Sequence, residues 1–154
     1  MIMISVVVPM FNEGGNAGPL HREILEVLQK MKQPFEIIFV DDGSTDSTRT
    51  VLQKLSPLTV ITFRKNFGQT SALDAGIKKA KGEYVVALDG DGQNDPADIP
   101  RLIEHLEKNN LDVVSGWRKN RQDDRSKKVS SLLAARLRKF LINDGIHDSG
   151  CTLK

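Results

Sequence analysis

The chain has 154 residues, of which 39% are hydrophobic and 27% charged, values typical of one soluble globular domain with a sizeable core. Its single cysteine, Cys151, excludes an internal disulfide and favours a reducing compartment. No apolar run reaches the roughly 20 residues of a membrane span, and the N-terminus, which lacks a basic region, predicts no signal peptide.

Short apolar, β-branched runs alternate with longer amphipathic stretches. Because parallel strands need crossover connections, this alternation predicts an α/β fold with a largely parallel sheet. The expected N-caps are Ser44 or Thr45 for the second helix and Asn66 for the third. In chain order the sequence predicts a strand over 3–9, a helix over 20–31, a strand over 35–40, a helix over 45–55, a strand over 58–63, a helix over 66–80, a strand over 84–88, a helix over 96–108, a strand over 111–115 and an amphipathic helix over 129–141.

Positive charge is concentrated in the C-terminal part of the chain. Residues 117–139 contain nine Lys and Arg and two Asp, which gives this stretch a charge of +7. The whole chain carries +2, so the remainder carries −5. This asymmetry favours an anionic partner near the C-terminal part, although a solvated helix face explains the same charges.

Polar side chains follow each predicted strand, at the edge where open α/β sheets bind ligands. After the fourth strand come Asp89, Gly90 and Asp91. Two carboxylates spaced by one residue can share Mg²⁺ or Mn²⁺, which prefer oxygen ligands, and the glycine lets the backbone approach closely. Taken alone, the motif is also explained as an acidic turn. With its position after a strand, it predicts a cation site that holds a substrate diphosphate.

The loop after the second strand begins with Asp41 and Asp42. Carboxylates at a strand end can accept hydrogen bonds from ribose hydroxyls or a base N–H, although a turn with a helix cap explains the same residues. Asn12 and Glu13, after the first strand, are uninformative by themselves. The sequence contains no GxGxxG, P-loop or CxxC motif, which argues against a dinucleotide oxidoreductase, a P-loop enzyme and a zinc site.

Four ordered segments resemble the motifs of family 2 inverting glycosyltransferases, which have the GT-A fold. With Gln93 after the acidic pair, they are similar to the polyprenyl-phosphate branch, which includes dolichol-phosphate mannosyltransferases and bacterial undecaprenyl-phosphate glycosyltransferases. The resemblance implies transfer of a sugar from a UDP- or GDP-sugar to a polyprenyl phosphate, with inversion and with Mg²⁺ or Mn²⁺ as cofactor. The segments are Val6–Glu13, Val40–Asp46, Arg64–Gly76 and Asp89–Pro96.

The resemblance also assigns roles to individual residues. It implies catalytic roles for Asp89, Asp91 and Arg118, the last of these binding phosphate. The implied metal ligands are Asp89, Asp91 and Gln93. The residues implied to bind the donor are Pro9, Asn12, Glu13, Asp41, Asp42, Gly68, Asp89 and Gly90.

The resemblance covers nearly the whole chain, which we interpret as one donor-binding domain over residues 1–154. Its nucleotide and metal part spans residues 1–116, and residues 117–154 hold the basic loop, the amphipathic helix and the start of the acceptor part. Members of the family normally continue further, so an incomplete GT-A domain is expected. A polyprenyl-phosphate acceptor implies a peripheral location at the cytoplasmic membrane face, and no nucleic-acid partner is expected.

Two other functions fit parts of the sequence. A metal-dependent nucleotidyltransferase uses a similar sheet and carboxylates, but usually has a glycine- and basic-rich loop where this chain has Phe11, Asn12 and Glu13. A non-catalytic nucleotide-binding module fits the short C-terminal part. Metal-dependent nucleotide binding and sugar transfer distinguish the three.

Overall fold

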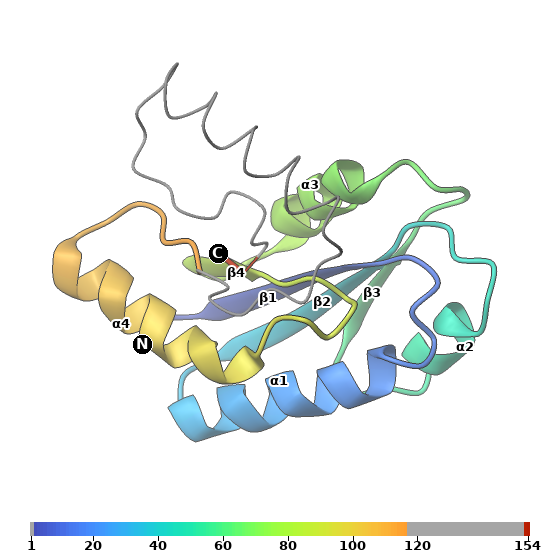
Figure 1. The fold of residues 1–154 in the computed structure, drawn as a ribbon. Coiled ribbons are helices and arrows are strands. Elements are labelled where there is room, and N and C mark those ends of the chain that lie inside the picture. Colours follow the sequence, from blue (N-terminus) through green and yellow to red (C-terminus); the bar gives the residue numbers. More distant parts are fainter. Residues whose placement is uncertain (1, 117–152) are drawn as a thin grey trace, which may run out of the picture.

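The computed structural model describes residues 2–116 and 153–154, and every structural statement below concerns these residues. Four parallel strands form one sheet in the order β3-β2-β1-β4 (Figure 1). β1 is central because it pairs with β2 on one side and with β4 on the other. The strands are β1 (Ile4–Met10), β2 (Phe35–Asp41), β3 (Thr59–Thr62) and β4 (Tyr84–Ala87).

Helices cover both faces of the sheet. One face is covered by α3, and the opposite face by α1, α2 and the η1–α4 segment (Figure 1). Among the described residues, no helix has the length and apolar character needed to cross a bilayer. The bounds are α1 (Ala17–Met31), α2 (Thr48–Leu52), α3 (Gln69–Lys79), η1 (Pro96–Asp98) and α4 (Ile99–Asn109).

β1 supplies both halves of the core. Each of its seven residues is buried, as expected of a central parallel strand with both faces covered. Because side chains alternate along a strand, Val6 and Val8 pack with the helices on the α1 face. Val7 packs on the other face with Val40 and with Ala72 of α3. The apolar run of β1 therefore fixes the sheet between its two helical layers.

The predicted fifth strand over residues 111–115 is wrong, because these residues form no strand. The place beside the end of β4 is taken by the last two residues of the chain. The Ala87 N–H donates to the Lys154 carbonyl at 2.9 Å, and the Lys154 N–H donates to the Ala87 carbonyl at 3.2 Å. On the other side, the Gly116 N–H donates to the Leu153 carbonyl at 2.9 Å. Residues 153–154 thus lie between Ala87 at the end of β4 and Gly116.

The helix predicted over residues 45–55 is present only as α2, with five residues. Its expected caps have other partners. The Ser44 hydroxyl accepts the Asn12 N–H, and the Thr45 N–H donates to the Asn12 side chain. These contacts with the loop after β1 hold residues 44 and 45 outside the helix.

The next two helices are confirmed, although the first of them starts later than predicted and the second begins with a 3₁₀ turn. α3 begins after Gly68 rather than at a cap by Asn66, whose side chain accepts the Gly68 N–H at 3.0 Å. The helix predicted over residues 96–108 is present as η1 followed by α4. The basic stretch 117–139 and the amphipathic helix 129–141 lie outside the described residues.

Candidate functional site

A pocket of about 360 Å³ opens at the carboxyl ends of the strands. In the order β3-β2-β1-β4, the chain moves outward from β1 in one direction and then returns to place β4 on its other side. The carboxyl ends beside such a reversal form the crevice in which open α/β sheets bind ligands. The pocket is lined by Pro9, Met10, Phe11, Glu13, Asp42, Asn66, Gln69, Asp89, Gly90 and Asp91.

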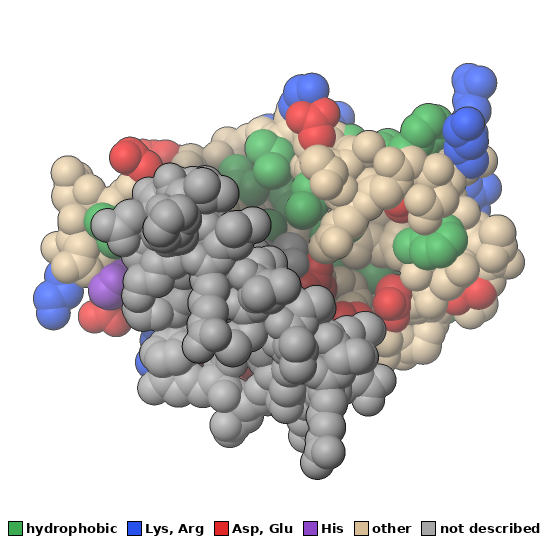
Figure 2. Space-filling model, turned by 45° about the horizontal axis from the view of Figure 1, so that its top comes forward, with side chains coloured by type: hydrophobic (Ala, Val, Ile, Leu, Met, Phe, Trp, Pro, Cys, Tyr) green, Lys and Arg blue, Asp and Glu red, His purple; other side chains and the backbone are tan. Residues whose placement is uncertain are grey.

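The lining of this pocket is acidic. It includes four carboxylates and, among the described residues, neither Lys nor Arg. The surface seen in Figure 2 also gathers acidic side chains near its centre and has Lys and Arg at its margins. The pocket therefore attracts cations and repels a bare diphosphate. The four carboxylates belong to Glu13, Asp42, Asp89 and Asp91.

The acidic loop after β4 is held tightly against β1. Its first peptide is fixed by the Leu88 N–H, which donates to the Val7 carbonyl at 3.1 Å. A Cβ atom at Gly90 would lie 2.8 Å from the Pro9 carbonyl oxygen, so only glycine fits there without a shift. The Asp91 side chain accepts the backbone N–H of Gln93 at 3.0 Å. This arrangement brings both aspartates of the motif to the pocket.

The two aspartates match part of what a hard cation needs. Carboxylate oxygens suit Mg²⁺ or Mn²⁺. No cluster of three or more His, Cys, Asp or Glu side chains that could hold a metal by itself exists in the described part of the chain. A cation at Asp89 and Asp91 would therefore take further ligands from water or from a substrate. Gln93, the predicted third ligand, is exposed and does not line the pocket.

Asp42 lines the pocket but is used mainly as an anchor. One carboxylate oxygen accepts the Phe67 N–H at 2.8 Å, and the other accepts the Gly68 N–H at 2.9 Å. Its own N–H donates to the Met10 carbonyl at 2.8 Å. Asp42 is only 3% exposed. Asp42 thus holds the loop before α3 against the ends of β1 and β2. Gly68, a predicted donor ligand, is one of the two residues whose N–H groups Asp42 binds.

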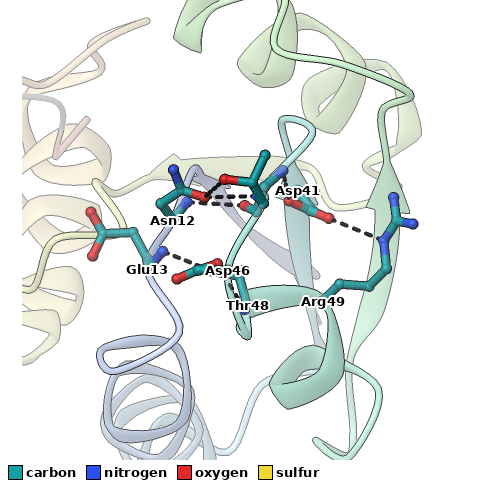
Figure 3. Close-up of polar contacts among 8 residues, drawn as sticks. Asn12, Glu13, Asp41, Asp46, Thr48 and Arg49 are labelled. Carbon is teal, nitrogen blue, oxygen red and sulfur yellow. Dashed lines mark hydrogen bonds and ion pairs between the residues drawn. The ribbon is translucent and has the colours of Figure 1, made fainter.

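Asp41 is fully buried and does not line the pocket. One of its oxygens accepts the Ser44 N–H at 2.9 Å. The other faces the Nε of Arg49 at 3.5 Å and has no hydrogen bond among the described residues (Figure 3). Buried polar atoms are rarely left in this state. Of the four carboxylate oxygens of Asp41 and Asp42, this one alone accepts no hydrogen bond from the described part of the chain.

Asn12 connects the loop after β1 to the loop after β2. Its side-chain oxygen accepts the Thr45 N–H at 2.8 Å, so its side chain faces that loop, and it does not line the pocket (Figure 3). The neighbouring Glu13 N–H donates to the Thr48 hydroxyl at 2.8 Å. The Glu13 carboxylate points away from these contacts and is among the groups that line the pocket (Figure 3).

Asp46 completes the connection between the two loops. Its carboxylate accepts the Thr48 hydroxyl and N–H, and also the Gly14 N–H. The hydrogen bonds from Thr48 hold the pKa of the Asp46 carboxyl below its ordinary value of 3.8, because they stabilise the ionised form.

The structure also adds residues to the predicted site. Phe11, Asn66 and Gln69 line the pocket, and Gln69 contacts Asp89 directly, its side-chain amide donating to Oδ1 at 2.6 Å. In the sequence they follow β1 and β3 and lie within the segments Val6–Glu13 and Arg64–Gly76, but no role is predicted for them. Arg118, the predicted phosphate ligand, lies outside the described residues.

Comparison with known proteins shows which family has this arrangement. The model of the family described as "Glycosyl transferase family 2" matches residues 5–153. The chain belongs to this glycosyltransferase family. The predictions of the family and of the GT-A fold, with its parallel sheet covered on both faces, are confirmed.

Similar proteins include two curated bacterial enzymes. A dodecaprenyl-phosphate galacturonate synthase of Rhizobium johnstonii is 41% identical over 98% of this chain and 46% of that protein. An undecaprenyl-phosphate 4-deoxy-4-formamido-L-arabinose transferase of Pectobacterium atrosepticum is 35% identical over 98% of this chain and 47% of that protein. The chain thus spans about half the length of the curated relatives it matches.

Among solved structures, a mannosyltransferase of Pyrobaculum calidifontis, in complex with GDP-Man and Mn²⁺, is similar at 28% identity. The match has a TM-score of 0.53 and covers 67% of this chain and 32% of that one.

Proposed function

We propose that the protein to which this chain belongs transfers a sugar from a nucleoside diphosphate sugar to a polyprenyl phosphate. The observation that carries the donor half is the acidic pocket. Four carboxylates and no described basic residue line it, so a diphosphate requires a cation between itself and the protein. The acceptor half is supported by the two curated relatives, whose names specify dodecaprenyl and undecaprenyl phosphate.

Asp89 and Asp91 are the proposed ligands of Mg²⁺ or Mn²⁺. Once bound, the cation supplies charge neutralisation of the nucleoside diphosphate leaving group. The Pyrobaculum mannosyltransferase structure, which contains GDP-Man and Mn²⁺, supports the pairing of such a donor with a divalent ion. Gly90 contributes by letting the loop approach β1, which sets both aspartates at the pocket. Gln93 and Arg118 remain proposed as further ligands of the cation and of phosphate.

Asp41 is proposed to recognise the nucleoside. Its second oxygen, which forms an ion pair with Arg49 and has no hydrogen bond among the described residues, is an acceptor that suits a base or ribose donor. Since the side chain is fully buried, a nucleoside reaches it only when the loop that carries Ser44 moves. Asp42 and Asn12 act through the loops they hold, while Pro9 and Glu13 line the pocket itself.

The acceptor phosphate is already anionic and nucleophilic, so the proposed transfer requires no strong general base. Its oxygen attacks the anomeric carbon opposite the departing diphosphate, which inverts that carbon. The charge of +7 over residues 117–139 supports contact with the acceptor phosphate and with anionic lipid at the cytoplasmic membrane face.

Isothermal titration calorimetry tests the donor half. We expect UDP or GDP, or one of their sugars, to bind only when Mn²⁺ is present. Asp91→Ala should abolish this binding with little loss of stability, because Asp91 is exposed and makes one contact with a loop N–H. Thr70→Ala, at an exposed position outside the pocket, is the matched control. Absence of metal-dependent binding to any nucleoside diphosphate contradicts the proposal.

Transfer assays separate the remaining functions. Incubation of the whole protein with donor and a polyprenyl phosphate should yield a lipid-linked sugar. Donor binding without transfer would indicate a nucleotide-binding module. Formation of a nucleotide–sugar bond from a nucleoside triphosphate and a sugar phosphate would indicate a nucleotidyltransferase.

A further inference from the structure

Gln69 and Asp89 form a contact between two motifs that are 20 residues apart in the sequence. The Gln69 side-chain Nε2 donates to Asp89 Oδ1 at 2.6 Å. Gln69 is the first residue of α3, and both residues line the pocket. Asp89 thereby has one carboxylate oxygen held by the protein before any ligand binds.

The backbone of Gln69 is itself held in place. Asp42 uses both carboxylate oxygens to bind the N–H groups of Phe67 and Gly68, the two residues that precede Gln69. Gly68 has φ +92°, which glycine adopts readily, and the chain turns there into α3. The Ser71 hydroxyl donates to the Phe67 carbonyl at 3.0 Å and closes the first turn. The Gln69 amide is therefore presented to Asp89 from a fixed position.

The chemistry of an amide donor suits this place. A neutral N–H group that binds one oxygen orients the carboxylate without adding positive charge that would repel a cation. Within residues 2–116 and 153–154, no hydrogen bond or ion pair occupies the other oxygen of Asp89. In metal sites, such hydrogen bonds to a ligating carboxylate typically contribute about 10- to 100-fold in metal affinity.

We propose that Gln69 is a positioning residue of the cation site, which orients Asp89 for a divalent ion by donating to its Oδ1. The inference rests on the proposed cation site at Asp89 and Asp91. Through the Phe67 and Gly68 amides, it also connects Asp42 to that site. The consecutive residues 67–69 are then hydrogen-bonded to both acidic motifs, to Asp42 after β2 and to Asp89 after β4.

The test measures Mn²⁺ binding to the 154-residue chain without donor, by electron paramagnetic resonance of free Mn²⁺. Gln69→Met removes the N–H donor but keeps an unbranched side chain with good helix propensity. We expect its Kd for Mn²⁺ to rise about 10-fold or more. Thr70→Met is the matched control, since Thr70 is exposed on the next position of α3 and does not line the pocket. Its Kd should equal that of the wild type.

Two further measurements keep the outcomes distinct. The thermal unfolding midpoint should be the same for Gln69→Met and the wild type, because Gln69 is exposed. If the Gln69→Met variant does not fold, the test is repeated with Gln69→Ala, because alanine has the highest helix propensity. Mn²⁺ binding that Asp91→Ala abolishes but Gln69→Met leaves unchanged overturns the role of Gln69 alone. Absence of Mn²⁺ binding to the wild type overturns the proposed cation site and this inference together.

Discussion

Asp41 and Asp42 show how two identical neighbours acquire different roles. Successive residues at the end of a strand point to opposite faces, so the two carboxylates meet different surroundings. Asp42 binds two backbone N–H groups of the loop before α3. Asp41 binds the Ser44 N–H and keeps one buried oxygen without a hydrogen bond. The sequence indicates a pair of carboxylates at a strand end, whereas their division of labour depends on loops far away in the chain.

Asp46 gives a pH-dependent prediction at the residue scale. The Thr48 hydroxyl and N–H lower the pKa of Asp46 from its ordinary value of 3.8. A lowered pKa in the folded state contributes stability that is present above the unfolded pKa and is lost as pH falls through the folded pKa. Thr48→Val removes the hydroxyl and keeps the shape. We expect the pKa of Asp46 to rise towards 3.8 and the loss of stability below about pH 4 to become less steep.

Carbon-detected NMR titration of the Asp46 carboxyl group measures this pKa directly. Urea unfolding at several pH values reports the linked stability. Thr48→Ser, which retains a hydroxyl, should keep the low pKa. An unchanged Asp46 pKa in Thr48→Val would show that the hydroxyl is not the cause. The Thr48 hydroxyl also accepts the Glu13 N–H, so a loss of stability that is independent of pH is expected as well.

At the scale of secondary-structure elements, the sequence predicts the order and the type of the helices and strands better than the residues at which they begin and end. Continuous apolar runs such as β1 and the amphipathic period of α1 are local signals, and both elements are present as predicted. The start of α2 was not predictable locally. Residues 44 and 45 are held by Asn12, which lies more than 30 residues away in the sequence. The same loop contacts explain why Asn12, a predicted donor ligand, faces the loop after β2.

The packing of α3 on the sheet yields a prediction at this scale. A Cβ atom at Gly76 would lie 2.3 Å from Val7 Cγ1 and 3.1 Å from Val40 Cγ2, both on buried strands. Gly76→Ala gains about 0.5–1 kcal/mol of helix stability. Overpacking costs about 1–3 kcal/mol, and the central strands cannot move away, so we expect net destabilisation.

The matched control for Gly76 is the same substitution in α1. Gly18 has nothing within 4 Å of an added Cβ atom, so Gly18→Ala should be neutral or stabilise the fold by up to about 1 kcal/mol. Urea unfolding of both variants measures the difference in the free energy of unfolding. Equal stability of the two variants would mean that α3 is not packed closely on β1.

At the scale of the whole molecule, the sequence-based prediction departs most from the structure at the edge of the sheet. Residues 111–115 have the composition of a strand, and the end of β4 is the natural neighbour for one. The backbone of Ala87 is nevertheless paired with Lys154, at the other end of the segment that the structure leaves undescribed. Local pattern indicates that a segment can pair, whereas the position beside β4 is decided by competition between distant segments.

The pocket is another property of the whole molecule that the sequence indicates only in part. The carboxyl ends of parallel strands meet at one edge, so a site with Asp89, Asp91 and Glu13 follows from their positions after strands. Which side chains reach the pocket and which hold loops does not follow. Gln69 illustrates this, because its contact with Asp89 requires that α3 begin where Asp42 fastens the preceding loop.

Leu153 gives the prediction at the scale of the whole molecule. It is 4% exposed and belongs to the core cluster that includes Val86 and Ile99, so the end of the chain contributes to the core of the described fold. Leu153→Ala removes buried apolar volume beside β4 and should lower the free energy of unfolding by about 2–5 kcal/mol, as core Leu→Ala substitutions do.

Lys154→Ala is the control, because Lys154 pairs with Ala87 through its backbone and its side chain is exposed. Urea unfolding should show this control within about 0.5 kcal/mol of the wild type. If Leu153→Ala were as stable as Lys154→Ala, the last residues would lie on the surface of the domain and residues 111–115 would be free to pair with β4.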